Sequence, residues 1–198
     1  MEEADLKLYT LWYNPYSMSV VWALKLKEST SACSYGGKPI CESMLILEYI
    51  DELWPHNPLV PHDPYQRTQA RFWAKYAHQM FVAVVVPLFY IYSADDEEKK
   101  KAIEKVQEQL KVVEDQCFSD EKNFFGGDTI NMVDLAFGSV LKFIEALEEF
   151  NDLKVIEPGK FHHLHSWFND FKDVQVIKEN LNPNDQMVAY FKVVKEKV

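Results

Sequence analysis

The chain has 198 residues, of which 47% are hydrophobic and 14% aromatic, so it has enough apolar material to fold around a core without disulfide bonds. Its three cysteines, Cys33, Cys41 and Cys117, form no CxxC pair, and their odd number argues against a disulfide framework. The acidic N-terminus lacks the basic start of a secretory signal. Together these features predict a cytoplasmic protein.

The formal net charge of −10 comes from 31 acidic and 21 basic residues and disfavours nucleic acid as a partner, because a phosphate backbone would be repelled. A run of three lysines, 99–101, directly follows four acids, which is typical of the start of a surface helix. The most apolar run, 81–92, is shorter than the roughly 20 residues that a membrane-spanning helix needs. We therefore expect neither nucleic acid nor a membrane as a partner.

The first residues predict a strand, a turn and a helix. Residues 6–12 alternate loosely and are rich in Leu, Tyr and Trp, which favours a strand that Asn14 and Pro15 end. From Ser17 to Leu26, apolar residues recur at helical spacing. Farther on, Gly36 and Gly37 supply the positive φ of a tight turn, so a hairpin is expected between 32–35 and 38–41.

A second helix and a linker complete this part of the chain. Apolar residues repeat at helical spacing from Ser43 to Trp54, and Pro55 ends the pattern. Residues 55–63 hold three prolines, which indicates an extended linker. We therefore expect a first domain at 1–54, a linker at 55–63 and a second domain at 64–198.

The second domain has the pattern of helices throughout. Asp63 and Pro64 are typical of a helix start, and the apolar stripe that follows keeps 3.6-residue spacing for five turns to Leu88. A second amphipathic stripe covers 103–117. Asn131 to Asp134 is a capping box, with a helix to about Leu147. Two further helices are predicted, at 159–171 and 185–195. The fold class is therefore α/β plus all-α.

Three stretches resemble the plant tau class of glutathione transferases. They are GGKPICESMLILEYIDELWP at 36–55, DPYQRTQARFWAKY at 63–76 and FFGGDTINMVDLA at 124–136. The resemblance implies a thioredoxin-like, glutathione-binding domain at 1–54 and an all-helical domain at 64–198 that lines a hydrophobic substrate site. It also implies a homodimer that uses glutathione as co-substrate, without a metal, to conjugate hydrophobic electrophiles in detoxification or to reduce organic peroxides.

Within this resemblance, Glu42 and Ser43 fall where the γ-glutamyl end of glutathione binds. Both stand at the start of a predicted helix, where the hydroxyl and free backbone N–H groups suit a carboxylate and Glu42 suits an ammonium. Ser43 acting merely as a helix cap is the alternative.

The catalytic position departs from the family. Relatives place a serine before the proline at the end of the first strand to stabilise the glutathione thiolate, and here that residue is Asn14. Asn14 still offers an N–H donor, and Ser17 offers a hydroxyl at the helix start. A turn residue and a cap are equally consistent roles for these two residues.

A second departure is a short connection. The family has a strand, a helix and a strand where only residues 28–35 stand here, and a parallel crossover alone needs a dozen or more residues. In relatives that region supplies a lysine and a loop that hold the glutathione backbone, and no residue in 28–35 takes over these roles. Either the protein truly lacks this segment or the sequence as given leaves these residues out.

The resemblance also positions an acceptor site between the two domains. By position its lining is Tyr16, Val82, Val86, Phe89, Phe143 and Phe191, which predicts a cleft almost without charge for large apolar substrates. Plain core packing is the alternative for each residue.

No metal centre is predicted, because surface positions explain His162, His163 and His165 better than a ligand set does. The leading hypothesis is thus an active transferase. A carrier of hydrophobic ligands or glutathione conjugates is the second, favoured by Asn14 and the short connection, and a structural module is the third.

Overall fold

The structure of the protein, a computed structural model, describes residues 8–11, 13–28, 34–35, 38–118 and 123–197. Its N-terminal part contains α1 (Pro15–Leu26), a hairpin of β1 (Ser34–Tyr35) and β2 (Lys38–Pro39), and α2 (Ser43–Leu53). The strands pair antiparallel with Ser34 opposite Pro39. Both predicted helices and the hairpin are confirmed, while the predicted turn at 36–37 lies outside the described residues.

The predicted first strand is wrong where the structure describes it. Residues 8–11 have no strand conformation, and the rest of 6–12 lies outside the described residues. Strand conformation is stabilised by pairing with a neighbour, and the sheet seen in the described ranges joins β1 to β2 only. The local alternation of residues 6–12 could not reveal that residues 8–11 have no partner strand among the described parts of the chain.

The long helical stretch after the linker begins as predicted. Asp63 accepts a hydrogen bond of 2.8 Å from the backbone N–H of Gln66, and Pro64 occupies the first turn of α3 (Pro64–Met80). The stretch continues through η1 (Phe81–Val85), α4 (Val86–Phe89) and η2 (Tyr90–Ser93).

The winding of this stretch changes at Phe81, which the constant 3.6-residue spacing did not predict. The segment η1 is a π-helix, in which the N–H of Val86 bonds to the carbonyl of Phe81. Pro87 follows directly; it has no N–H to donate, and its ring would clash with the carbonyl of Ala83 in a regular helix. A wider turn relieves that conflict and rotates the residues after Phe81 around the helix axis.

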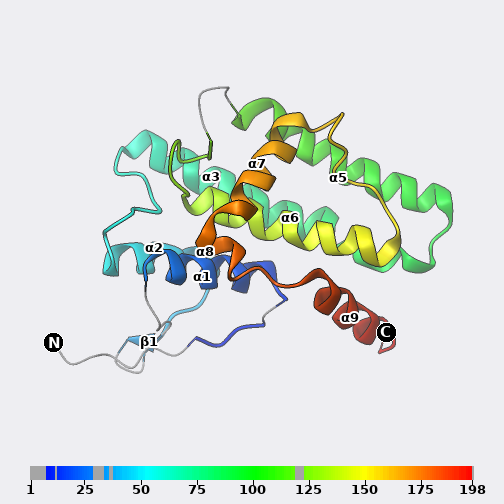
Figure 1. Ribbon diagram of the computed structural model, residues 1–198, viewed down its shortest axis with the longest axis horizontal. Coiled ribbons are helices and arrows are strands. Elements are labelled where there is room, and N and C mark those ends of the chain that lie inside the picture. Colours follow the sequence, from blue (N-terminus) through cyan, green and yellow to red (C-terminus); the bar gives the residue numbers. More distant parts are fainter. Residues whose placement is uncertain (1–7, 12, 29–33, 36–37, 119–122, 198) are drawn as a thin grey trace.

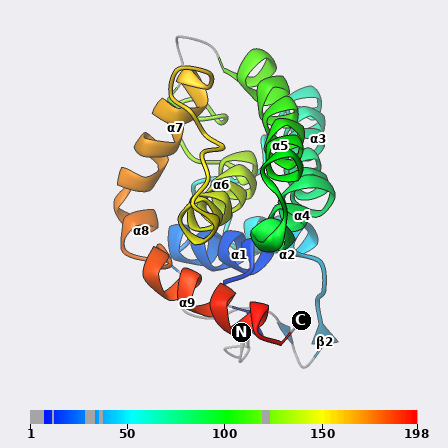
Figure 2. The same cartoon turned by 90° about the vertical axis from the view of Figure 1, so that its right-hand side faces the viewer.

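Helix α6 (Met132–Asn151) is the centre of the helical part, with α3 and α5 (Asp96–Cys117) on one side and α7 (His162–Asp173) on the other (Figure 2). Its start is the predicted capping box: Asn131 accepts from the N–H groups of Val133 and Asp134, and Asp134 accepts from the N–H of Asn131. The Phe171 ring of α7 packs directly on the α6 backbone at Gly138, since a Cβ at that position would lie 2.3 Å from the ring. This helix therefore organises the core.

The chain ends in α8 (Gln175–Lys178) and α9 (Asn184–Lys195), which cross beneath α6 (Figure 1). Helix α1 packs against α6 and this C-terminal part. The fully buried Trp22 lies edge-to-face with Phe171 at 5.5 Å and donates from Nε1 to the carbonyl of Asn180 at 3.0 Å. The N-terminal helices are thus packed on the helical part by apolar contact.

Length and composition alone would allow the continuous stretch Pro64–Ser93 to cross a membrane, with 39% of its most apolar window buried. From the sequence, no membrane-spanning helix is expected because the apolar run 81–92 is too short, but the observed helical stretch of 30 residues is long enough. The core helix of a soluble protein passes the same test, and Ala70, Ala74 and Ala77 of this stretch are buried. Its composition is therefore weak support for a membrane span.

Candidate functional site

A cavity of about 750 Å³ opens between the N-terminal helices and α3. Four of the predicted site residues line it: Tyr16 from α1, Glu42 and Ser43 from the start of α2, and Val82 from η1. The remaining lining residues were not predicted; they are Lys75, His78, Gln79 and Ala83. The structure therefore brings the predicted glutathione-binding pair together with two of the predicted substrate-binding residues and adds polar residues to them, whereas Asn14 and Ser17 are not among the residues that line this cavity.

The start of α2 has the geometry of an anion site. Glu42 precedes the helix with φ 74° and ψ 112°, a left-handed conformation that is strained for a residue with a side chain, and it makes no side-chain cap. The N–H of Ile46 is the first to bond within the helix, to the carbonyl of Glu42. The N–H groups of the first turn are thus left for an anion at the cavity wall.

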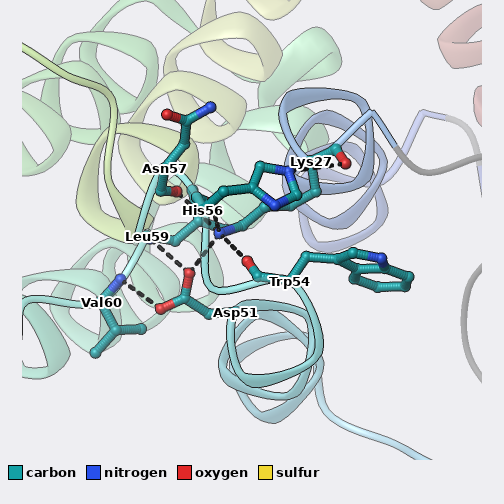
Figure 3. Close-up of polar contacts among 7 residues, drawn as sticks. All are labelled: Lys27, Asp51, Trp54, His56, Asn57, Leu59 and Val60. Carbon is teal, nitrogen blue, oxygen red and sulfur yellow. Dashed lines mark hydrogen bonds and ion pairs between the residues drawn. The ribbon is translucent and has the colours of Figure 1, made fainter.

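A buried ion pair fixes the other end of α2. The Lys27 ammonium is fully buried and donates a hydrogen bond of 2.7 Å to Asp51. It also donates to the carbonyls of Trp54, His56 and Asn57, with hydrogen bonds of 2.7, 2.6 and 2.9 Å (Figure 3). Every hydrogen of this buried ammonium therefore has an acceptor.

The carboxylate of the same pair holds the linker. Asp51 accepts from the backbone N–H groups of Leu59 at 2.7 Å and Val60 at 3.1 Å (Figure 3). The carbonyl of Leu59 in turn accepts from the N–H of Met132 at the start of α6. Helix α2, the linker and α6 are therefore joined by one polar network, which fixes where Ser43 lies.

Asn14 is the N-cap of α1. Its side-chain oxygen accepts 2.8 Å from the N–H of Tyr16, so its amide nitrogen is the group left to donate to a thiolate. The Ser17 hydroxyl oxygen accepts from the N–H of Leu11 at 3.2 Å, which leaves its hydrogen as a donor. Asn14 thus caps α1 through its side-chain oxygen, and its side-chain nitrogen is still able to donate a hydrogen bond to a thiolate.

Tyr16 and His78 form the wall opposite Ser43. Their rings meet edge-to-face at 4.6 Å, and the Tyr16 hydroxyl donates to the carbonyl of His78 at 3.4 Å. Burial, and then the charge of Glu42, raises the pKa of the Tyr16 hydroxyl. Burial lowers the pKa of His78 to about 4, so the imidazole is neutral near pH 7. Both groups are therefore neutral at this wall, and the buried Nε2 of His78 has no hydrogen-bond partner among the described residues.

The other predicted lining residues belong to the core. Phe89, Phe143 and Phe191 are buried and pack on one another, with ring centroids 5.0 Å apart for Phe143 and Phe191 and 5.5 Å for Phe89 and Phe191. Val86, partly buried, packs against the same core. Phe81 connects this aromatic cluster to the cavity wall, at 5.4 Å from Tyr16 and 5.1 Å from Phe143.

The predicted charge of the cleft needs correction as well. Because the π-helical turn rotates residues after Phe81, Val82 is exposed to the cavity while Phe89 faces the core. Glu42 and Lys75 carry charges on the cavity wall, so it is not almost without charge. A signal for Lys75, His78 and Gln79 was present: they precede Val82 by seven, four and three residues, which puts them on one face of a helix.

Of the three histidines near residue 162, His163 makes contacts that give it a structural role. Glu114, buried on α5, accepts from the backbone N–H groups of His163 and Leu164 at 2.9 and 2.8 Å and contacts His163 Nδ1 at 3.0 Å. This carboxylate caps the start of α7. Within the described ranges, no group of three or more metal-ligating side chains comes together.

Comparisons with known proteins agree with this architecture. The family model for the glutathione S-transferase C-terminal domain matches residues 74–172. A Nicotiana tabacum protein named "Probable glutathione S-transferase" is 33% identical, with 96% of this chain and 93% of that protein covered. A glutathione transferase of Zea mays is 30% identical over 100% of this chain and 99% of its own length.

Solved structures give the same result. The crystal structure of a tau-class glutathione S-transferase from mango, Mangifera indica, superimposes with a TM-score of 0.84 at 30% identity, covering 96% of this chain and 98% of that chain. The alignment with the maize protein spans 224 positions, which exceeds the 198 residues of this chain by 26. Relatives therefore contain residues that this chain lacks. The sequence identities and the shared fold together show that the chain belongs to the glutathione transferase family and to its tau class.

Proposed function

We propose that this protein conjugates glutathione to electrophilic small molecules. The observation that carries the proposal is the cavity in which the uncapped start of α2, with Glu42 and Ser43, faces Tyr16 and the wall of α3. A helix N-terminus attracts a carboxylate, and Glu42 suits the neighbouring ammonium of a γ-glutamyl group. The maize and mango relatives, which are named as transferases, support the assignment.

The thiolate is the attacking species in this reaction, so the site must favour it over the thiol. Asn14 at the N-cap of α1 and the hydroxyl of Ser17 are two side-chain donors at the start of this helix that could serve the thiolate. Hydrophobic electrophiles would contact Val82, Ala83 and the ring of Tyr16, which form the apolar part of the wall. Detoxification and the reduction of organic peroxides are further parts of this proposal.

The first experiment mixes the purified protein with glutathione and a chlorinated nitrobenzene and follows conjugate formation. We expect a rate above the uncatalysed background and protection against thermal unfolding by S-alkyl glutathione. A background rate together with retained binding of a hydrophobic dye would instead support a carrier. Absence of any glutathione protection would remove the functional assignment while leaving the family assignment intact.

The domain organisation is proposed on the same basis. A glutathione-binding domain of thioredoxin-like type at 1–54, a linker at 55–63 and a helical domain at 64–198 are consistent with the network that joins Asp51, the linker and Met132. The chain is then missing part of the first domain, and the region between α1 and β1 is where the residues present in relatives would fit.

We further propose a homodimer in the cytoplasm. Phe72 and Tyr65 are 55% and 72% exposed and lie seven residues apart on α3, with Leu45 of α2 58% exposed. The Arg71 guanidinium pairs with Glu48 through two hydrogen bonds of 2.8 and 2.7 Å, which joins these two helix surfaces. Light scattering after gel filtration tests this: Phe72→Glu should convert a dimer to a monomer, and a monomeric wild type would contradict it.

A further inference from the structure

Lys75 is a cation in the cavity that the proposed reaction has not yet used. It lies on α3, is exposed, and lines the cavity together with Glu42 and Ser43. None of the carboxylates in the described ranges forms an ion pair with it. In a chain with a net charge of −10, an unpaired ammonium on the wall of a proposed anion site is positioned to bind an anion.

Glutathione carries three charged groups near pH 7 besides its neutral thiol: one ammonium and two carboxylates. The cavity has three features of matching sign. Glu42 suits the ammonium, and the start of α2 at Ser43 suits the γ-glutamyl carboxylate. His78 is neutral at this pH because burial lowers its pKa to about 4, so it cannot neutralise the second carboxylate. Lys75 is the cation that remains among the lining residues that the structure describes.

We propose that Lys75 binds the glycyl carboxylate of glutathione, an inference that rests on the proposed function. Three residues in extended form span roughly 10 Å, and the cavity of about 750 Å³ has room for such a peptide. The cation is supplied by α3, the first long helix after the linker.

The chemistry of lysine suits this role. Its ammonium is a compact charge on a long flexible stem, so it can follow a carboxylate at the end of a peptide without a preformed geometry. Because Lys75 is exposed, its interaction with the carboxylate is screened by salt. The glycyl carboxylate takes no part in the reaction at sulfur, so the interaction contributes to substrate binding and not to the chemical step. Removal of such a uniform binding interaction raises KM and leaves kcat unchanged.

The test compares ligands that differ only at the glycyl end. Calorimetry on the wild type, Lys75→Met and Lys75→Arg measures the dissociation constants of glutathione and of two ligands without a second carboxylate, its glycyl ethyl ester and γ-glutamylcysteine amide. Lys105→Met is the matched control, since Lys105 is an exposed lysine of α5 outside this cavity. The wild type should bind glutathione roughly tenfold more tightly than either ligand that lacks the second carboxylate.

Lys75→Met should lose that preference, binding all three ligands with the weaker affinity, while Lys75→Arg and Lys105→Met should keep most of it. Equal binding of glutathione and its ester by the wild type, with conjugation intact, would overturn the role of Lys75 and leave the proposed function standing. So would a Lys75→Met variant that weakens all three ligands equally. Failure of the wild type to bind glutathione at all would overturn both.

Discussion

The side-chain oxygen of Asn14 accepts a hydrogen bond of 2.8 Å from the backbone N–H of Tyr16, so the residue that we propose for the catalytic position is also the N-cap of α1. One atom of the amide is thereby committed to the helix. The nitrogen atom is left to face a thiolate, and an amide N–H is a weaker donor for this purpose than a hydroxyl.

Asn14→Ser should therefore raise the conjugation rate. Serine caps helices about as well as asparagine, so the free energy of unfolding should change by less than about 1 kcal/mol. A stronger hydrogen bond to the thiolate is worth about 1.5 kcal/mol, which corresponds to a roughly tenfold increase in kcat/KM. The rate and the pH dependence of glutathione ionisation check this, with Ser17→Ala as the companion variant. An unchanged rate in Asn14→Ser would show that the donor at this position does not limit turnover.

His78 should make the protein sensitive to acid. Its pKa falls from 6.5 in the unfolded chain to about 4 in the folded protein because burial disfavours the charged form. Between these values the unfolded state binds more protons, so stability from this group is full above pH 6.5 and is lost as pH falls toward 4. The expected loss between pH 7 and pH 5 is about 2 kcal/mol.

The measurement compares urea unfolding of the wild type and His78→Phe at pH 7 and pH 5. Phenylalanine keeps a ring against Tyr16 and removes the titrating nitrogen, so the variant should lose less stability at pH 5 than the wild type. Asp134, whose pKa burial raises to about 6, titrates in both proteins and cancels in the difference. Equal acid sensitivity in the two proteins would contradict the burial of a neutral His78.

Removal of the Lys27 ammonium should destabilise the fold strongly. Lys27→Met leaves the Asp51 carboxylate partly buried without its cation and leaves the carbonyls of Trp54, His56 and Asn57 without a donor. Breaking a buried pair from one side costs about 3 to 5 kcal/mol. Chemical denaturation checks this, and Lys111→Met, which breaks the exposed pair with Asp115, should have no measurable effect. Similar behaviour of the two variants would mean that the Lys27 network contributes little.

Val82 and Phe143 should respond in opposite ways to truncation. Phe143 is 8% exposed and packs between Phe81 and Phe191, so Phe143→Ala should cost about 3 to 5 kcal/mol of stability. Val82 is 59% exposed on the cavity wall, so Val82→Ala should leave stability nearly unchanged and alter the KM for bulky acceptors. Thermal unfolding and acceptor kinetics on both variants check this. A shift in acceptor preference from Phe143→Ala at full stability would place that ring back in the site.

The sequence by itself determined the local elements and the residues at the start of α2. Capping residues such as Asp63 and Asn131 act on the backbone N–H groups within the next few residues, so their patterns predict helix starts without knowledge of the rest of the fold. The resemblance at 36–55 likewise identified Glu42 and Ser43 before their cavity was known.

Only the tertiary structure decided which faces of these elements meet. The π-helical turn at Phe81 changes the angle between successive side chains, so a stripe of constant spacing could not separate Val82, on the cavity, from Phe89, in the core. Helical spacing puts Lys75 and His78 on one face with Val82, but they share a cavity with Ser43 only because α3 lies across from α2, a relation between segments thirty residues apart that no local pattern contains. Long-range contacts fixed that relation: Arg71 of α3 pairs with Glu48 of α2, and the Asp51 carboxylate joins the end of α2 to the linker that leads into α3.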